Sequence, residues 1–316
     1  IGLDDRNNWA ELQSNLCSVM IAAVRRLHSG MAPIGDRLMT SLLTLIQNSA
    51  KQPTVLEDAF VAVGTVIVAL EADFGKYLEA FLPFLVEGLR NHEEHQLCTI
   101  SVGIVGDVCR SLAERATKYS ETLVLALFED LQSPVLHRNV KPHILSCFGD
   151  IAMAIGPAFE SYLPTAMAVL QQASMVQNAP DTADYEMVEY VNDLREGIAE
   201  AYVGIVSGFR MAGKADVLLP YMDYTLAFVG LVASDSIDRS ETLLRSTIGL
   251  VGDLATAYPT GPVMVKLQQP WVFEYIKVGR SRGNGTETRK TANWAREVLK
   301  KSASLGSSSS GTPILS

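Results

Sequence analysis

The sequence predicts an all-α protein in which pairs of helices stack into an α-α superhelix, and three observations carry this prediction. Apolar residues recur with a 3.6-residue period along almost the whole chain, and no convincing stretch shows the two-residue alternation of a strand. Turn signals rich in glycine, proline and polar residues separate the periodic segments. The third observation is an internal repeat, which indicates how the helices pair.

Taken in order, the periodic segments predict helices over residues 8–28, 36–49, 54–73, 75–90, 93–115, 120–132, 139–155, 159–175, 184–210, 215–233, 239–257, 262–279 and 287–301. The stretch GMAPIGD ends the first helix, QSPVLHRN separates the sixth from the seventh, and QNAPDTAD precedes the ninth. YPTGP and GRSRGNGTE bound the twelfth. The stretch after residue 302 is serine-rich and of low complexity, so we expect one solenoid over 1–302 and a disordered tail over 303–316.

The internal repeat is marked by aligned glycines at Gly64, Gly106, Gly149, Gly204 and Gly252, which are 42, 43, 55 and 48 residues apart. A tyrosine follows thirteen positions after the first three, and a phenylalanine ten positions after two of them. A period of about 40–47 residues with two helices per unit is typical of HEAT repeats. We therefore expect about six helix pairs after one extra helix, with the glycine-bearing helices second in each pair and on the concave side.

Composition narrows the function. The chain has 316 residues and a net charge of −9, which argues against general nucleic-acid binding and favours basic partners. We expect no membrane-spanning segment and no signal peptide, and because the sequence begins at Ile1 we take it for a fragment or a processed product. The four cysteines lie in apolar helical patterns without a CxxC pair, which favours buried thiols in a cytosolic or nuclear protein over a zinc or redox site.

The most unusual segment is DYEMVEYVNDLREGIAEAY, residues 184–202. Glu186, Glu189, Asp193, Glu196 and Glu200 fall on one face of the predicted helix, opposite its apolar residues. Like charges at this spacing destabilise an isolated helix by roughly 0.2–0.5 kcal/mol per pair. A solvated outer face is the simplest interpretation, and a binding surface for a basic partner is the alternative.

Two features favour the binding surface. Arg195 is the only base of this helix before Arg210, and residues 177–265 hold thirteen acids against five bases. We also count Asp107, Asp150 and Asp253, which follow three of the aligned glycines, as further acids of the same groove.

The C-terminal end reverses sign, with nine bases against three acids over residues 266–301. A polar capping repeat explains this charge best. Trp294 lies on the last predicted helix, either as a core anchor or as an exposed surface for a partner's arginine or aliphatic side chain.

Several long stretches resemble one family. ADYEMVEYVNDLREGIAEAYVGIVSGF, GIVGDVCRSL, HRNVKPHILSCFGDIAMAIG, GKYLEAFLPFLVEGLRN and NWAREVLKK are similar to the C-terminal HEAT-repeat part of importin-β (karyopherin-β1). The resemblance covers roughly residues 9–301 and implies a nuclear import receptor acting in the cytoplasm, in the nucleus and at the nuclear pore. The N-terminal part of the family, which holds its main Ran-binding surface, is absent from this sequence.

The resemblance also implies partners. It assigns binding of the basic importin-β-binding helix of an importin-α adaptor to Asp184, Glu186, Glu189, Asp193, Glu196 and Trp294, while Glu200 extends the stripe by periodicity alone. It further implies hydrophobic slots between outer helices for Phe-Gly nucleoporins, whose residues the sequence does not name.

Other functions fit less well. A HEAT scaffold of another kind, such as a phosphatase scaffolding subunit or a coat adaptor, is allowed by the repeats alone. For an enzyme, the nearest metal-like motif is NHEEH at 91–95, whose histidines are three apart rather than four, and we take it for a solvated helix cap. No phosphate-binding loop or nucleophile motif occurs. We expect no catalysis, cofactor, metal, nucleic acid or membrane.

Overall fold

The computed structural model describes residues 3–177, 185–235 and 239–308, and these residues are helical with no strand among them. The chain divides into two compact units, residues 1–155 and 156–316, which are described separately. The prediction of an all-α protein is confirmed. A single solenoid over 1–302 stays a prediction.

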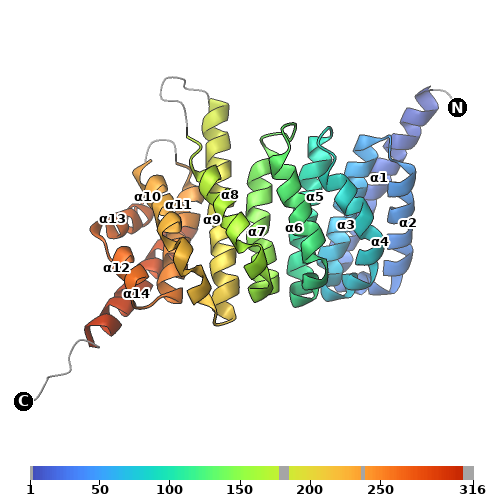
Figure 1. Cartoon of the computed structure of the whole chain (residues 1–316). Helices are drawn as coiled ribbons and strands as arrows, with labels where there is room; N and C mark the ends of the chain where they lie inside the picture. The colour runs from blue at the N-terminus through green and yellow to red at the C-terminus, as the bar shows by residue number, and fades with distance from the viewer. Residues whose placement is uncertain (1–2, 178–184, 236–238, 309–316) are drawn as a thin grey trace, which may run out of the picture. The chain divides into compact units, whose positions relative to one another are not determined.

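The first unit has two layers of helices (Figure 1). One layer contains α1 (Leu3–Leu27), α3 (Pro53–Leu70), α5 (His95–Leu112) and α7 (Val140–Ile155), each packed on the next. The other contains α2 (Gly35–Asn48), α4 (Gly75–Leu89) and α6 (Thr117–Gln132). Each helix of the second layer also packs on the following helix of the first, which gives the pairs α2–α3, α4–α5 and α6–α7.

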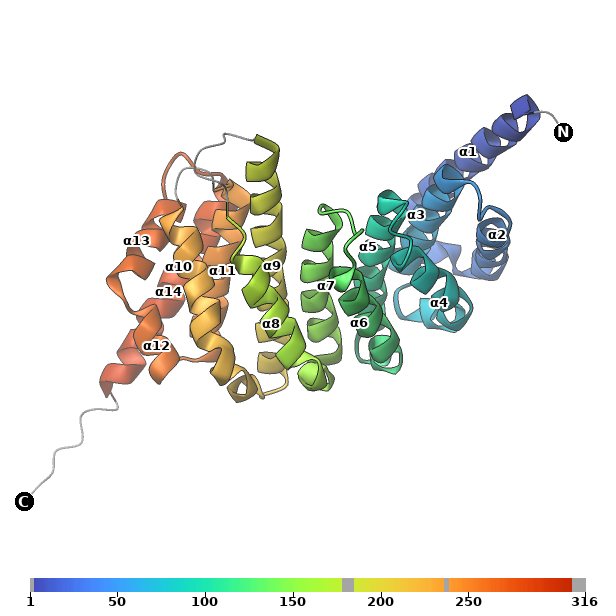
Figure 2. The ribbon, with the colours of Figure 1, turned by 45° about the horizontal axis from the view of Figure 1, so that its top comes forward.

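The second unit repeats this arrangement. Its first layer contains α9 (Tyr185–Met211), α11 (Glu241–Ala257) and α14 (Thr286–Ser308), packed in that order. The other helices are α8 (Leu163–Ser174), α10 (Met222–Ser234), α12 (Pro262–Leu267) and α13 (Pro270–Gly279) (Figure 2). The six predicted pairs and the lone first helix are therefore present, with α12 and α13 together forming the first member of the last pair.

Three predicted elements differ from the structure, each for a local reason. The helix expected over 262–279 is broken before Pro270, which cannot donate the backbone hydrogen bond that would continue it. The helix expected over 215–233 begins as the 3₁₀ segment η5 (Ala215–Tyr221), which contains Pro220. Helix α14 runs to Ser308, so the first six residues of the expected disordered tail are helical, and 309–316 lie outside the described residues.

The repeated aromatic residues pack where one pair ends and the next begins. Phe74 and Phe159 are completely buried in the 3₁₀ turns η2 (Glu71–Phe74) and η4 (Gly156–Ser161). Each contacts the tyrosine three residues later, Tyr77 or Tyr162, with ring centroids 5.8 Å apart in both repeats. The sequence repeat is therefore a repeat of packing as well.

Two stretches are long and apolar enough to cross a membrane by composition, contrary to our expectation from the sequence. They are Val140–Ser161 and Ala215–Ser234. Each combines an α-helix with a 3₁₀ segment, and 50% and 39% of their windows are buried inside the protein. Core helices pass the same test, so this is weak evidence for a membrane.

All four cysteines are free and buried, as predicted. Burial raises the pKa of the Cys17 thiol to about 11 and the pKa of the Cys98 and Cys109 thiols to about 12. Because the thiolate is the reactive form, these thiols are inert side chains of the core.

The turns of the first unit hold residues with positive φ. His28, Glu71 and Ala113 have φ of 47–48°, and Gly156 occupies the next corresponding turn with φ of 52°. At Ala113 ψ is −132°, a combination close to the first central position of a type II′ turn, which glycine favours. A Cβ atom in such a region costs of order 1–3 kcal/mol.

Replacement of Ala113 by glycine is therefore expected to raise the free energy of unfolding by about 1 kcal/mol, since the relieved strain exceeds the entropy that glycine loses on folding. The matched change Gly156→Ala is expected to lower it by about the same amount. Urea unfolding of both variants measures this. A loss of stability in Ala113→Gly would show that the turn is not strained.

Candidate functional site

Helix α9 places its acidic and apolar residues on opposite faces, as the sequence predicts. Its buried residues include Val191, Leu194, Ile198, Tyr202 and Ile205. Glu186, Glu189, Asp193 and Glu200 are exposed, whereas Glu196 is half-buried. Asp184 lies outside the described residues. We call Glu186, Glu189, Asp193 and Glu200 the acidic stripe.

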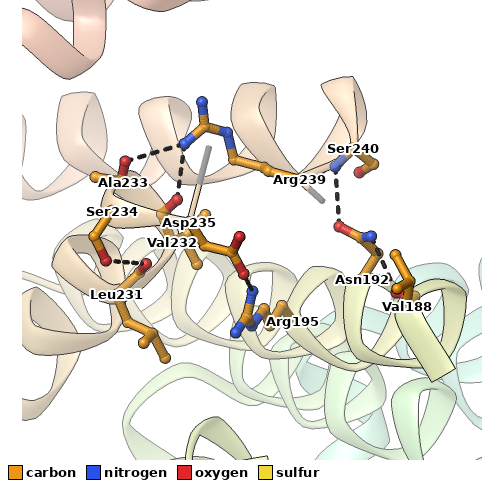
Figure 3. A network of polar contacts seen from close by, with 10 residues as sticks. All are labelled: Val188, Asn192, Arg195, Leu231, Val232, Ala233, Ser234, Asp235, Arg239 and Ser240. Atoms are coloured by element: carbon orange, nitrogen blue, oxygen red, sulfur yellow. Dashed lines mark hydrogen bonds and ion pairs between the residues drawn. The ribbon is translucent and has the colours of Figure 1, made fainter. Parts of the chain in front are cut away.

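The one base among these acids is directed away from them. The side chain of Arg195 is only 5% exposed, and its Nη1 lies 2.6 Å from Oδ2 of Asp235, just after α10 (Figure 3). This pair ties α9 to the end of α10. Arg195 therefore has a structural role in the folded protein, because its guanidinium forms an ion pair with Asp235.

A second contact of the same kind involves Glu196. Ser240 caps the N-terminus of α11, where its Oγ accepts a hydrogen bond from the backbone N–H of Leu243. The same hydroxyl donates to Oε1 of Glu196 at 2.6 Å. Asn192 Oδ1 accepts the backbone N–H of Ser240 at 2.9 Å (Figure 3). Glu196 thus holds the start of α11 on α9, which periodicity alone did not indicate.

Trp294 lies on α14 against an aligned glycine of α11. A Cβ atom at Gly252 would overlap the ring of Trp294, so the indole rests on this glycine. The residue nevertheless remains 42% exposed. The two interpretations left open by the sequence are combined here, because one part of the indole packs on α11 and another part faces solvent.

Asp253 follows this glycine and is half-buried. Burial raises the pKa of its carboxyl to about 6, while the charge of Arg210 acts in the opposite direction. The charge of this carboxyl therefore depends on pH around 6.

Asp107 and Asp150 belong to the first unit and share one arginine. Arg110 Nη2 lies 2.8 Å from Oδ1 of Asp107, and its Nη1 pairs with Oδ2 of Asp150. One positive charge therefore offsets half of the charge of these two carboxylates. We conclude that they form an ion-pair bridge between α5 and α7.

A cluster of polar side chains at the loops of the first unit was not predicted from the sequence. His92 Nε2 lies 2.9 Å from Oδ1 of the buried Asp130, and His92 Nδ1 lies 2.9 Å from Oγ of Ser133. His92 is thus half-buried, and the solvated cap expected for NHEEH is wrong for this residue. The three side chains join the α4–α5 loop to the end of α6 as a clamp. No local signal could reveal it, because the partners are about 40 residues apart.

An apolar cavity of about 270 Å³ lies between α2, α3 and α4 of the first unit. Its lining includes Ile46, Leu56, Phe60, Phe84 and Leu97. Gln47, Glu87 and Asn91 add polar groups to it. We call this cavity the outer slot. In the part of the chain that the structure describes, no cluster of three or more His, Cys, Asp or Glu side chains could hold a metal ion.

Comparison with known families decides where this architecture belongs. The family described as "Importin subunit beta-1-like, TPR repeats" matches residues 1–280. This chain belongs to the importin subunit beta-1 family. The stacked helix pairs are therefore those of an importin-β HEAT-repeat solenoid, as the sequence predicts.

Individual relatives agree. Importin subunit beta-1 of Schizosaccharomyces pombe is 41% identical over 303 residues, and that of Arabidopsis thaliana is 34% identical over 310 residues. Each alignment covers 96% of this chain and 35% of the relative, so the chain spans about a third of the length of these relatives.

Solved structures of the family superpose closely. A crystal structure of importin beta matches with a TM-score of 0.91 and 41% identity, covering 96% of this chain and 36% of that one. Kap95 in complex with Nup1 and Kap95p bound to RanGDP match with TM-scores of 0.86 and 0.82. Both are 33% identical to this chain, with 96% of it and 35% of each of them covered.

The raised pKa of Asp253 gives a test of its environment. The native state binds this proton more tightly than the unfolded chain, whose pKa is 3.8, so the charged carboxylate destabilises the fold as pH rises through 6. We expect Asp253→Asn to raise the free energy of unfolding by on the order of 2 kcal/mol at pH 8. The gain should disappear at about pH 3 or below, where both states are largely protonated. Urea unfolding at the two pH values measures it, and an equal gain at both would exclude burial as the cause.

Proposed function

We propose that this chain is the adaptor-binding part of a nuclear import receptor that acts between cytoplasm and nucleus and at the nuclear pore. Family membership supports the class of function. The observation that carries the finer proposal is the acidic stripe, exposed on α9 in the same helix layer as the exposed edge of Trp294. A basic, amphipathic helix such as the importin-β-binding helix of an importin-α adaptor has the complementary charge.

The energetics require several contacts at once. An exposed ion pair contributes about 0.2–1 kcal/mol, so the stripe provides about 1–4 kcal/mol if each acid finds one base. An arginine or lysine over the exposed part of Trp294 adds about 0.5–1 kcal/mol. Since a dissociation constant of 1 μM corresponds to about 8 kcal/mol, tight binding needs further apolar contacts along the helix.

The outer slot supports a second class of partner. It lies between α2, α3 and α4, is lined by aromatic and aliphatic side chains, and includes amide and carboxylate groups. A phenylalanine ring can fill the apolar part, while the polar groups bond the backbone of the adjoining glycine. The related Kap95 was solved with Nup1, which supports Phe-Gly nucleoporins as ligands.

Ran is the third partner we propose, bound mainly by the N-terminal part of the longer receptor. The related Kap95p was solved with RanGDP. The alternative of a phosphatase scaffolding subunit or a coat adaptor rested on the repeats alone, and the family match over residues 1–280 disfavours it.

Reversing the charge of the stripe tests adaptor binding. We expect Glu189→Lys/Asp193→Lys to weaken binding of a fluorescent basic adaptor helix at least tenfold, because two attractive contacts become repulsive. Glu196 is left intact, since it holds α11. The matched control Glu160→Lys/Glu274→Lys changes the net charge equally on exposed residues outside α9 and should bind almost normally. Equal losses in both variants would indicate attraction to the net charge instead of a site.

Filling the outer slot tests nucleoporin binding. Ala50 is an exposed residue that lines the slot, and Ala50→Trp is expected to weaken binding of a Phe-Gly repeat peptide at least fivefold, whereas Ala50→Ser should not. Chemical-shift titration with the labelled peptide gives the affinity. The stripe variants should bind this peptide normally. If Ala50→Trp also does, the ligand binds elsewhere.

A further inference from the structure

The first unit contains a second cavity, of about 420 Å³, on the layer formed by α1, α3 and α5. Its floor is α3, at Gly64, Thr65 and Val68, and its walls are provided by α1 and α5. Aliphatic side chains such as Val24 and Ile104 make most of the lining. We call this cavity the inner recess. It shares α3 and α5 with the outer slot, but the residues that line the two cavities are different.

The recess contains an aligned glycine whose surroundings are less crowded than those of Gly106 and Gly252. At Gly106 a Cβ atom would lie 2.5 Å from Oδ2 of Asp150, and at Gly252 it would overlap the ring of Trp294. At Gly64 it would meet only ordinary contacts, at 3.5 Å from Ile104 and 3.7 Å from Asp107. The space beside the aligned glycine is thus filled by a side chain of the protein itself at Gly106 and Gly252. We call this space the notch, and it is less crowded at Gly64.

Two observations bear on access to the recess. Asp107, which corresponds to Asp150 and Trp294 in the repeat, lies beside Gly64 and pairs with Arg110 of its own helix. Gly103 on the wall is exposed, and a Cβ atom there would meet nothing within 4 Å. A side chain arriving from solvent can therefore enter over α5 without displacing any atom near Gly103.

The charges at the recess indicate the flanking residues of an occupant. Arg25 and His28 lie on the α1 side and are exposed. On the α5 side Asp107 shares Arg110 with Asp150, so its charge is only partly offset. The α1 side of the rim is thus cationic at Arg25, whereas the α5 side keeps part of the negative charge of Asp107.

We propose that the inner recess binds an aromatic side chain of a partner protein, carried on a segment with acidic residues beside it. Trp294 over Gly252 shows that an indole fits the notch of this repeat. The aliphatic lining removes the aromatic ring from water, and the guanidinium of Arg25 attracts the acidic flank. This partner differs in charge from a basic adaptor helix, so the proposal does not depend on the proposed function of the stripe.

A synthetic peptide with a central 5-fluorotryptophan between glutamates is a suitable probe, because its ¹⁹F signal is separate from the tryptophans of the protein. We expect the signal to shift on titration with the intact chain. Gly103→Leu should weaken binding at least tenfold, since leucine fills the entrance. The change should not lower the melting temperature, because leucine favours a helix more than glycine does.

The matched control is Gly230→Leu on α10, where a Cβ atom would meet only the ring of Trp271 at 4.0 Å. It should bind the peptide normally. Arg25→Glu should weaken the glutamate-flanked peptide and strengthen a lysine-flanked one. The proposal is overturned if no ¹⁹F shift occurs up to millimolar concentrations, if Gly103→Leu binds normally, or if both peptides bind equally well to the intact chain.

Discussion

The close approach of successive helices at the aligned glycines is the constraint on which this architecture depends. A helix pair of this length cannot bury its apolar face alone, so each pair must pack on the next. At Gly106 and Gly252 the missing side chain leaves room for Asp150 and Trp294 of the following repeat, while at Gly64 the following helix packs at ordinary contact distance. The packing at these glycines therefore stabilises the stack. It also decides which side chains lie on the layer of α1, α3, α5 and α7 in one unit, and on the layer of α9, α11 and α14 in the other.

Much of the fold could be predicted from the sequence because it depends on local periods. The 3.6-residue pattern gave most helices within a few residues, and the recurrence of Gly64, Phe74 and Tyr77 in later repeats gave the pairing. The failures have local physical causes that the period does not contain. Pro270 breaks a helix without interrupting its apolar pattern. The positive φ of Ala113 could not be predicted, because alanine is not a residue type that favours this conformation.

The candidate site was less predictable because its contacts join residues about 40 positions apart. Periodicity placed the exposed acids of α9 correctly, yet it treated Glu196 as one of them, although Ser240 engages its carboxylate. The sequence pattern also placed Arg195 among the acids of α9, whereas in the structure its side chain is buried and pairs with Asp235. The outer slot and the inner recess depend on which side chains meet across helices, so no single segment encodes either.

The contact between Trp294 and Gly252 has a consequence for mutation. A larger residue at position 252 collides with the indole, and a smaller one at position 294 leaves a notch, so the effects of changes at the two positions are not additive. The same holds for Gly106 and Asp150. A library that varies one position at a time would therefore score these sites as intolerant, although paired changes 42 or 44 residues apart retain acceptable combinations.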